Sequence, residues 1–196
     1  HYAVYEIPVY ALKWQGRDIA VCVSFEGSGG AAMVMEELIA LGARTFLAIG
    51  SCGCLDAGIA EGHLIVPTAA YRDEGASYHY VAASDFVDVP SADGLTRALD
   101  EMGLKYTRTR TWTTDAPYRE TRENVRRRAG QGCGVVEMEC AGLAAVAQFR
   151  QVKFAQVFYG ADSLAGAEWD TRTLGAMPDN DTDRLVIVAL DAAVRL

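Results

Sequence analysis

The 196-residue chain has no apolar run close to the roughly 20 residues that span a bilayer. Its first residues do not read as a secretory signal peptide. From these two absences we expect a cytoplasmic protein with no membrane partner. The composition is 51% hydrophobic and 22% charged, which suits one globular domain over residues 1–196 with a sizeable core.

Positive charge is also scarce. The formal net charge is −8, which argues against a protein that binds nucleic acid through its phosphates. The one basic cluster, at 119–128, also contains Glu120 and Glu123. We interpret it as the solvated face of a helix, and we expect no nucleic-acid partner.

Cysteine and histidine are too few for a metal or disulfide framework. The five cysteines are odd in number and lie mostly in apolar segments, as reduced thiols do. Cys52 and Cys54 lack the two-residue spacing of a zinc or redox pair, and no second pair is present. We therefore expect no metal.

Apolar strand patterns alternate with helix patterns along the chain. This order predicts an α/β domain with a largely parallel, helix-covered sheet. We expect a surface loop over 163–183, and Pro67 indicates an edge strand or a bulge. The expected strands are 18–25, 44–49, 63–70, 105–112 and 152–160, and the expected helices are 31–41, 95–102, 121–128 and 181–196.

Two carboxylates end a further strand-like stretch, in the run VVEMECAG at 135–142. Carboxylates are rarely fully buried without a partner, and open α/β sheets bind ligands beyond the carboxyl ends of their strands. Glu137 and Glu139 are therefore candidates for ligand binding. The alternative is that Glu139 only complements the dipole of the helix that follows.

Glycine-bearing turns are expected after two strands. Gly27, Gly29 and Gly30 precede a helix, but their spacing is not that of a dinucleotide-binding loop, and no acid follows at the required distance. A tight turn is the simpler interpretation. In the second turn, Gly50-Ser51-Cys52-Gly53, successive amides and the Ser51 hydroxyl could hold an anion.

The same turn could instead present Cys52 as a nucleophile. A thiol hydrolase needs a general base, and the chain offers only His1, His63 and His79. We keep this possibility as an alternative.

Asp162 follows the expected strand 152–160, again at a carboxyl end. A strand-end aspartate in a cleft can act as a general acid if partial burial raises its pKa. Taken alone it is more simply an Asx-turn or helix cap, but it would lie beside Glu137 and Glu139. Acids that cluster at neighbouring strand ends repel one another, which favours a functional role.

In combination, four motifs in this order resemble those of the purine nucleoside/uridine phosphorylase family, and in particular its uncharacterised bacterial phosphorylase-like branch. The resemblance runs from about 21 to 169. It implies a three-layer α/β/α fold around a mixed, partly barrel-like sheet. The motifs are Gly50-Ser51-Cys52-Gly53, Thr113-Thr114-Asp115-Ala116-Pro117-Tyr118, Val136-Glu137-Met138-Glu139 and Tyr159-Gly160-Ala161-Asp162-Ser163.

The resemblance implies cleavage of a nucleoside N-glycosidic bond by phosphate, giving free base and ribose 1-phosphate. Phosphate would be a co-substrate, and no cofactor is implied. Family members associate, so the resemblance also implies a homo-oligomer, a dimer or a trimer of dimers, with sites often completed across a dimer. A purine base is slightly favoured, because the Gln-Arg pair typical of uridine enzymes is missing.

The resemblance assigns roles to matching positions. Asp162 would protonate or hydrogen-bond the departing base. Glu139, Met138 and Glu137 would form the ribose site, because a carboxylate's two oxygens suit two hydroxyls and methionine packs under the sugar. Ser51, Gly50 and Gly27 would hold phosphate, and Cys52, Gly53, Val136 and Tyr118 would lie near the base.

Two departures concern the phosphate side. Ala48 stands where characterised phosphorylases have an arginine, and their amino-terminal Gly-Asp-x-x-Arg loop has no counterpart here. A phosphate without a bidentate arginine is held less well; Arg72, Arg119 or a neighbouring subunit's arginine could substitute. We expect a chain that lacks the amino-terminal phosphate-loop segment. A nucleosidase that uses water, and a non-catalytic nucleoside-binding protein, remain alternatives.

Overall fold

The computed structural model describes residues 6–196. Residues 1–5 lie outside this range, and with them His1, one of the three candidate general bases. Within the described residues, no helix is long and apolar enough to cross a membrane.

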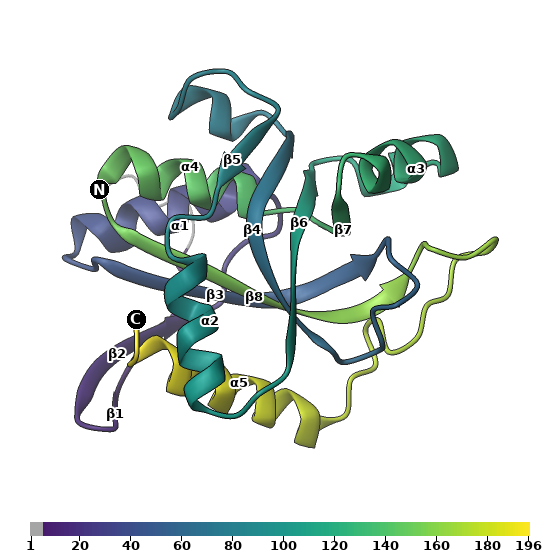
Figure 1. Ribbon diagram of the computed structural model, residues 1–196. Helices are drawn as coiled ribbons and strands as arrows, with labels where there is room; N and C mark the ends of the chain where they lie inside the picture. The colour runs from purple at the N-terminus through teal and green to yellow at the C-terminus, as the bar shows by residue number, and fades with distance from the viewer. Residues whose placement is uncertain (1–5) are drawn as a thin grey trace.

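The described chain alternates strands and helices, as expected (Figure 1). The strands are β1 (Val9–Trp14), β2 (Arg17–Cys22), β3 (Thr45–Cys54), β4 (Leu64–Asp73), β5 (Phe86–Asp88), β6 (Tyr106–Thr114), β7 (Cys133–Glu137) and β8 (Lys153–Ser163). The helices are α1 (Ser28–Ala40), α2 (Ala92–Glu101), α3 (Arg122–Gly130), α4 (Cys140–Arg150) and α5 (Asp179–Ala193), with 3₁₀ turns η1 (Ala76–His79) and η2 (Pro117–Arg119).

Six strands form one mixed sheet in the order β5-β4-β6-β7-β3-β8. The ladders β3–β8, β4–β6 and β6–β7 are parallel, whereas β4–β5 and β3–β7 are antiparallel. A further antiparallel pairing joins β4 to β8 and closes part of the sheet into a barrel. The expectation of a mixed, partly barrel-like sheet is confirmed.

Helices lie on both sides of this sheet. Helices α1 and α4 pack together on one side, where α4 contacts β4, β5 and β8, while α2 and α5 lie on the other side against β8 and β3 (Figure 1). Helix α3 lies beside β7. The three-layer α/β/α architecture is therefore confirmed.

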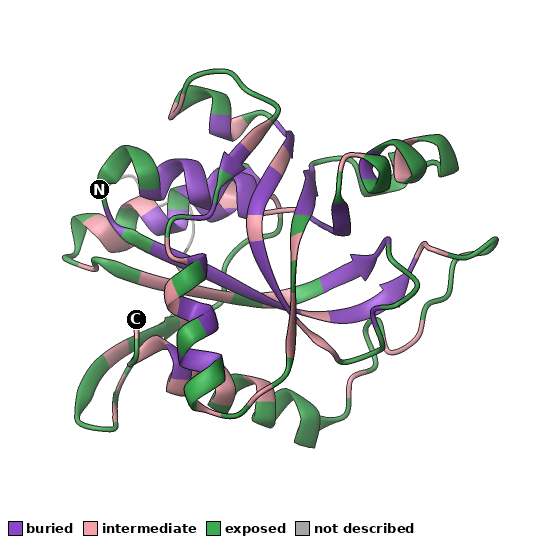
Figure 2. Ribbon diagram, in the orientation of Figure 1, coloured by how far each residue is buried: buried purple, intermediate pink, exposed green. Residues whose placement is uncertain are grey.

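Small side chains let α4 lie deep in the core. All residues from Cys140 to Ala147 are buried, and most are alanine or glycine. A Cβ on Gly142 would lie 2.7 Å from the Ser28 Cβ, so this glycine permits the amino-terminal ends of α1 and α4 to meet. Figure 2 shows buried residues along α4 and the barrel strands, and exposed residues over much of the β1–β2 hairpin.

The hairpin corrects one expectation. The strand expected at 18–25 is β2, and among the described residues it pairs only with β1, which the sequence analysis did not anticipate. Strand β2 is mostly exposed. It therefore stands apart from the six-stranded sheet, although its pattern is that of a buried strand.

The turn predicted at Gly50-Ser51-Cys52-Gly53 is also wrong. Strand β3 continues through these four residues to Cys54 and pairs with β8 throughout. The register shifts at Cys52/Gly53, so a β-bulge replaces the expected turn. Strand β8 likewise extends to Ser163 and contains Asp162. By contrast, the bulge indicated by Pro67 is present, between Pro67 and Ala70 of β4.

Candidate active site

Asp162, Gly53 and Val136 lie side by side on three adjacent strands. Gly53 of β3 pairs with Asp162 of β8 on one side and with Val136 of β7 on the other. A Cβ on Gly53 would lie 3.0 Å from Val136 Cγ1, 3.2 Å from Asp162 Oδ1 and 2.7 Å from Leu164 Cδ1. A side chain at position 53 would therefore collide with its neighbours, so the glycine lets Val136, Asp162 and Leu164 lie close together here.

The Asp162 side chain is held by a tryptophan that the sequence analysis did not single out. Asp162 is only 8% exposed, and its Oδ2 accepts a 2.7 Å hydrogen bond from Trp169 Nε1. Trp169 lies in the loop after β8, which backbone hydrogen bonds between Ser163 and Asp170 close into a short hairpin. The loop thus fixes the orientation of the candidate catalytic carboxyl group.

Glu137 is buried at the end of β7 and forms hydrogen bonds only within the protein. Its Oε2 accepts from the amides of Glu139 (2.8 Å) and Cys140 (2.7 Å), at the start of α4. Its Oε1 accepts from the hydroxyls of Thr111 and Thr113. Burial raises the pKa of Glu137 to about 7, against the lowering effect of the Thr113 hydrogen bond.

Glu139 lies two residues further on, at the boundary between β7 and α4, and is only partly buried. Its Oε1 accepts a 2.6 Å hydrogen bond from the Gly27 amide, just before α1. Burial is the main cause that raises the pKa of Glu139, and the nearby acids Glu26 and Asp115 raise it further. Met138, between the two glutamates, is also half-buried.

Of the three predicted phosphate residues, Gly27 adjoins Glu139, and Gly50 and Ser51 lie within β3. Gly27 has φ +85°, a conformation that glycine adopts without strain. Ser51 is exposed, so its hydroxyl is accessible. Because Gly50 and Ser51 belong to an extended strand, they do not form the compact nest of amides that a turn would have provided.

Cys52 lies beneath this face, in the core. It is 4% exposed and its thiol donates to the Tyr159 carbonyl oxygen at 3.5 Å. Burial raises its pKa well above that of a free thiol. His63 bonds instead to Thr107 near the amino-terminal ends of β4 and β6, and His79 lies in η1. The thiol-hydrolase alternative is therefore wrong for the described residues.

Tyr118, predicted near the base, is fully exposed on η2. The structure does not bring it to Asp162, because η2 turns its side chain to solvent. Glu120, two residues later, instead lines a pocket of about 220 Å³ together with Trp169 and Leu164. Burial, and then the charge of Asp162, raise the pKa of Glu120 to about 7.

The arginines considered as substitutes at the phosphate side are differently placed. Arg72 is buried, and its guanidinium donates to Ser77 Oγ, Ser84 Oγ and the carbonyl oxygens of 81, 82 and 84. Arg72 holds the loop around η1, and its guanidinium nitrogens already donate hydrogen bonds within the protein. Arg119 is exposed on η2.

Comparison with known proteins identifies the family to which the chain belongs. A family model described as the phosphorylase superfamily matches residues 2–194. This chain belongs to the phosphorylase superfamily. The curated relatives it matches include nucleoside phosphorylases, so the chain is a member of an enzyme family.

Two relatives illustrate the range within the superfamily. A guanosine phosphorylase from Halorubrum lacusprofundi is 28% identical over 199 residues, which cover 97% of this chain and 82% of that protein. A uridine phosphorylase from Thermococcus kodakarensis is 36% identical over 108 residues, or 54% of this chain and 39% of that protein.

Solved structures of the superfamily share the fold. A purine nucleoside phosphorylase from Toxoplasma gondii, in complex with immucillin-H, aligns with a TM-score of 0.83 at 20% identity, over 97% of this chain and 80% of that one. The Plasmodium knowlesi homolog of the Plasmodium falciparum enzyme aligns with a TM-score of 0.79 at 21% identity, over 98% and 78%. These likenesses establish the fold.

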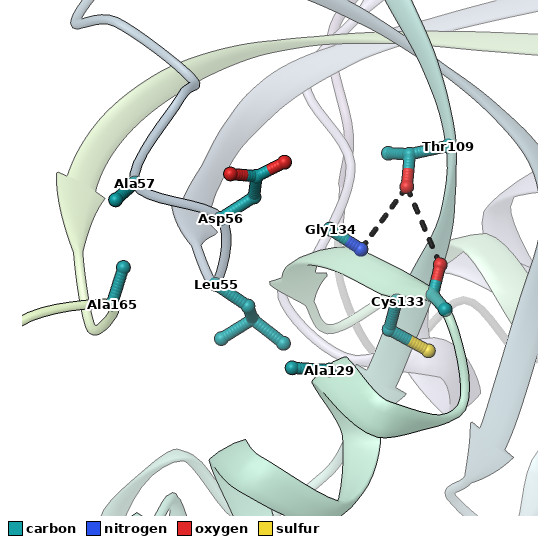
Figure 3. A pocket seen from close by; sticks show the side chains of 9 residues that line it. Leu55, Asp56, Ala57, Thr109, Ala129, Cys133, Gly134 and Ala165 are labelled. Atoms are coloured by element: carbon teal, nitrogen blue, oxygen red, sulfur yellow. Dashed lines mark hydrogen bonds between the residues drawn. The ribbon is translucent and has the colours of Figure 1, made fainter.

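A larger hollow, of about 470 Å³, is lined by none of the predicted site residues (Figure 3). Its polar groups are already paired: Thr109 Oγ1 accepts from the Gly134 amide at 3.1 Å and donates to the Gly132 carbonyl oxygen. The Cys133 thiol donates to the Thr111 carbonyl oxygen, and burial raises its pKa to about 11. The Asp56 carboxylate also lines the hollow, and its Oδ1 accepts from the Gly58 amide at 2.8 Å. Asp162 and Glu139 remain the candidate active site. In the part of the chain that the structure describes, no group of three or more His, Cys, Asp or Glu could hold a metal.

Proposed function

We propose that this chain cleaves the N-glycosidic bond of a purine nucleoside, with phosphate as the nucleophile, to give free base and ribose 1-phosphate. The observation that carries the proposal is the placement of Asp162 and Glu139. Asp162 pairs with Gly53 on the neighbouring strand, and Glu139 follows the next but one strand end, where it accepts from the Gly27 amide. The guanosine phosphorylase relative, which aligns over nearly the whole chain, supports a purine.

In this proposal Glu139 binds the sugar. A carboxylate has two oxygens, and can accept hydrogen bonds from both the 2′- and 3′-hydroxyls of ribose. Met138 packs under the sugar ring. Glu137 is a positioning residue, because its carboxylate fixes the amides of Glu139 and Cys140 at the start of α4.

Asp162 acts on the base. As the glycosidic bond breaks, negative charge develops on the leaving purine, and a carboxyl group within hydrogen-bond reach can donate a proton to it. Trp169 orients Asp162 for this step through its 2.7 Å hydrogen bond. In this proposal the flat base lies beside Asp162 and Val136, the two residues that flank Gly53 in the sheet.

In this proposal phosphate lies near the exposed Ser51 hydroxyl, Gly50 and Gly27.

A specific observation favours water as the alternative nucleophile. The charged groups that act on Glu139 are the acids Glu26 and Asp115, Ala48 replaces an expected arginine, and Arg72 is committed elsewhere. Negative surroundings disfavour a bound phosphate.

The requirement for phosphate distinguishes phosphorolysis from hydrolysis by water. Purified protein is incubated with guanosine, inosine, adenosine and uridine, each with and without phosphate, and base release is followed by chromatography. Phosphorolysis predicts base release, with ribose 1-phosphate as the second product, only when phosphate is present. Equal release without phosphate, with free ribose, would make the protein a nucleosidase. A nucleoside-induced shift in melting temperature without any release would identify a non-catalytic nucleoside-binding protein.

We further propose a cytoplasmic homo-oligomer, a dimer or a trimer of dimers, whose neighbouring subunit adds cationic groups to the phosphate side. Exposed apolar side chains on and near the β1–β2 hairpin support this proposal, since they suit a subunit contact; they include Val9, Tyr10, Val21 and Val23. Light scattering after size exclusion measures the mass. A monomer at micromolar concentration would contradict the oligomer.

A further inference from the structure

Helix α3 turns a charged face to solvent. On its inner side, Val125 packs against a small apolar cluster and Arg128 is buried, with its Cζ 3.5 Å from the centroid of the Tyr71 ring. Glu123 and Arg127 are four residues apart, so they lie together on the opposite face, and both are exposed. Figure 1 shows α3 at the edge of the molecule, far from the β1–β2 hairpin. The outer face of α3 is therefore a surface separate from the hairpin.

The two ends of α3 adjoin an exposed aromatic side chain and an apolar hollow. Before the amino-terminal end, Pro117 and Tyr118 belong to η2, and the Tyr118 side chain is fully exposed. Proline restricts the backbone and tyrosine has only two side-chain torsions, so such a turn loses little conformational freedom when it is bound. Beside the carboxyl-terminal end lies the hollow of about 470 Å³ (Figure 3). Its lining is mostly small or apolar, with Ala57, Ala129, Gly132, Gly134, Ala165, Leu55 and Cys133.

The charges at the two ends are also complementary. Arg119 is exposed next to Tyr118, and the exposed Asp56 carboxylate lines the hollow. On the helix itself, Glu123 lies in the first turn and Arg127 in the last. A surface with opposite charges at its two ends matches a second copy of itself in the antiparallel direction. A uniformly acidic partner would instead be repelled by Glu123 and Asp56.

We propose that η2, the outer face of α3 and the hollow form a twofold interface with a second copy of this chain, in which the two α3 helices pack antiparallel. In a twofold interface each contact is made twice, with the partners exchanged. The nine residues of α3 span about 14 Å, at about 1.5 Å per residue. Antiparallel packing therefore brings Tyr118 of each copy to the hollow of the other. Arg119 then meets the partner's Asp56, and Glu123 meets the partner's Arg127.

This interface goes beyond the proposed function. It does not depend on nucleoside cleavage, and it uses a different surface from the β1–β2 hairpin. The proposed trimer of dimers requires two kinds of subunit contact, and α3 supplies the second of them.

Charge reversal tests the interface. Light scattering after size exclusion gives the masses of the wild-type protein, Glu123→Arg, Arg127→Glu and the double variant at several concentrations. Each single reversal sets like charges opposite one another, so we expect a lower mass and a dissociation constant raised by about tenfold or more. The double variant restores opposite charges and should recover the wild-type mass. Single variants that keep the wild-type mass, or a double variant no better than the singles, would overturn the inference. Glu37→Arg, exposed on α1, is the control and should not change the mass.

A cross-link tests the antiparallel arrangement. Arg126 is exposed at the middle of α3, close to the proposed twofold axis. In the presence of a mild oxidant, Arg126→Cys should therefore form a disulfide between two copies, seen as a dimer on a non-reducing gel. Adding Tyr118→Ala should lower the yield, because it removes the aromatic anchor of the interface, and Glu37→Cys should give no such dimer. Failure of Arg126→Cys to cross-link would contradict the arrangement.

Failure of this inference and failure of the proposed function are distinguishable. A wild-type monomer would contradict both the α3 interface and the proposed oligomer. A wild-type oligomer whose mass survives both single reversals would contradict the α3 interface alone. A protein that turns over no nucleoside would contradict the cleavage proposal and has no bearing on the masses. Melting temperatures check that each variant is folded.

Discussion

Glu137 and Glu139 are two residues apart and have different surroundings. Glu137 accepts hydrogen bonds from two amides and two threonine hydroxyls inside the protein, whereas Glu139 is partly exposed and bonds to the Gly27 amide. The first carboxylate therefore organises the start of α4, and the second is left to meet a ligand. The same chemical group serves structure at Glu137 and, in the proposed function, binding at Glu139.

This difference predicts opposite effects of substitution. Glu137→Ala leaves buried amides and hydroxyls without an acceptor, so we expect a loss of about 3 kcal/mol in the free energy of unfolding. Glu139→Ala is expected to change stability by less than about 1 kcal/mol and to raise KM for ribonucleosides. Urea denaturation and steady-state kinetics measure the two effects. Equal destabilisation by both substitutions would contradict this division of roles.

At the scale of elements, β3 carries the site because it continues where the sequence predicts a turn. Its bulge at Cys52/Gly53 sets Asp162 beside Gly53. It also directs Cys52 to the core, where burial excludes the thiol from chemistry. The strand thus presents a glycine, rather than a cysteine, at the proposed position of the base.

A methyl group at Gly53 tests this arrangement. In Gly53→Ala the new Cβ would lie 2.7 Å from Leu164 Cδ1 and 3.0 Å from Val136 Cγ1, closer than unstrained atoms approach. We expect KM for the nucleoside to rise by about tenfold or more, with a cost in stability of about 1–3 kcal/mol from overpacking. Gly130→Ala in α3 is the control, because its Cβ would meet nothing within 4 Å. Unchanged nucleoside kinetics in a folded Gly53→Ala protein would contradict the placement of the base.

Sequence alone predicted the order of strands and helices better than the ends of the strands or the directions of the side chains. Val136, Gly53 and Asp162 lie together because they end neighbouring strands, and this is a matter of periodicity and order. The surroundings of Tyr118 and Cys52 could not be predicted in this way. The η2 turn exposes Tyr118 to solvent, whereas the alternation of side chains along β3 buries Cys52. Glu120 belongs to the basic cluster at 119–128 that the sequence analysis interprets as a solvated helix face, although this residue precedes the helix.

At the scale of the whole molecule, the two sides of the site differ. The proposed sugar and base sides are built from residues of one chain that the sheet brings together, namely Glu139 and Asp162. On the phosphate side the charges near Glu139 are acidic, and Arg72 is occupied within the fold. The proposed oligomer would supply the missing cations from a neighbouring subunit, which makes activity dependent on assembly.

The most direct test of the account is the rate of guanine release from guanosine by the wild-type protein and by Asp162→Asn. An amide cannot donate the proton that the leaving base requires, so we expect kcat to fall by about 100- to 10,000-fold. Asp183→Asn, on the exposed face of α5, should keep the wild-type rate. Undiminished guanine release by a folded Asp162→Asn protein would show that the chemistry takes place elsewhere.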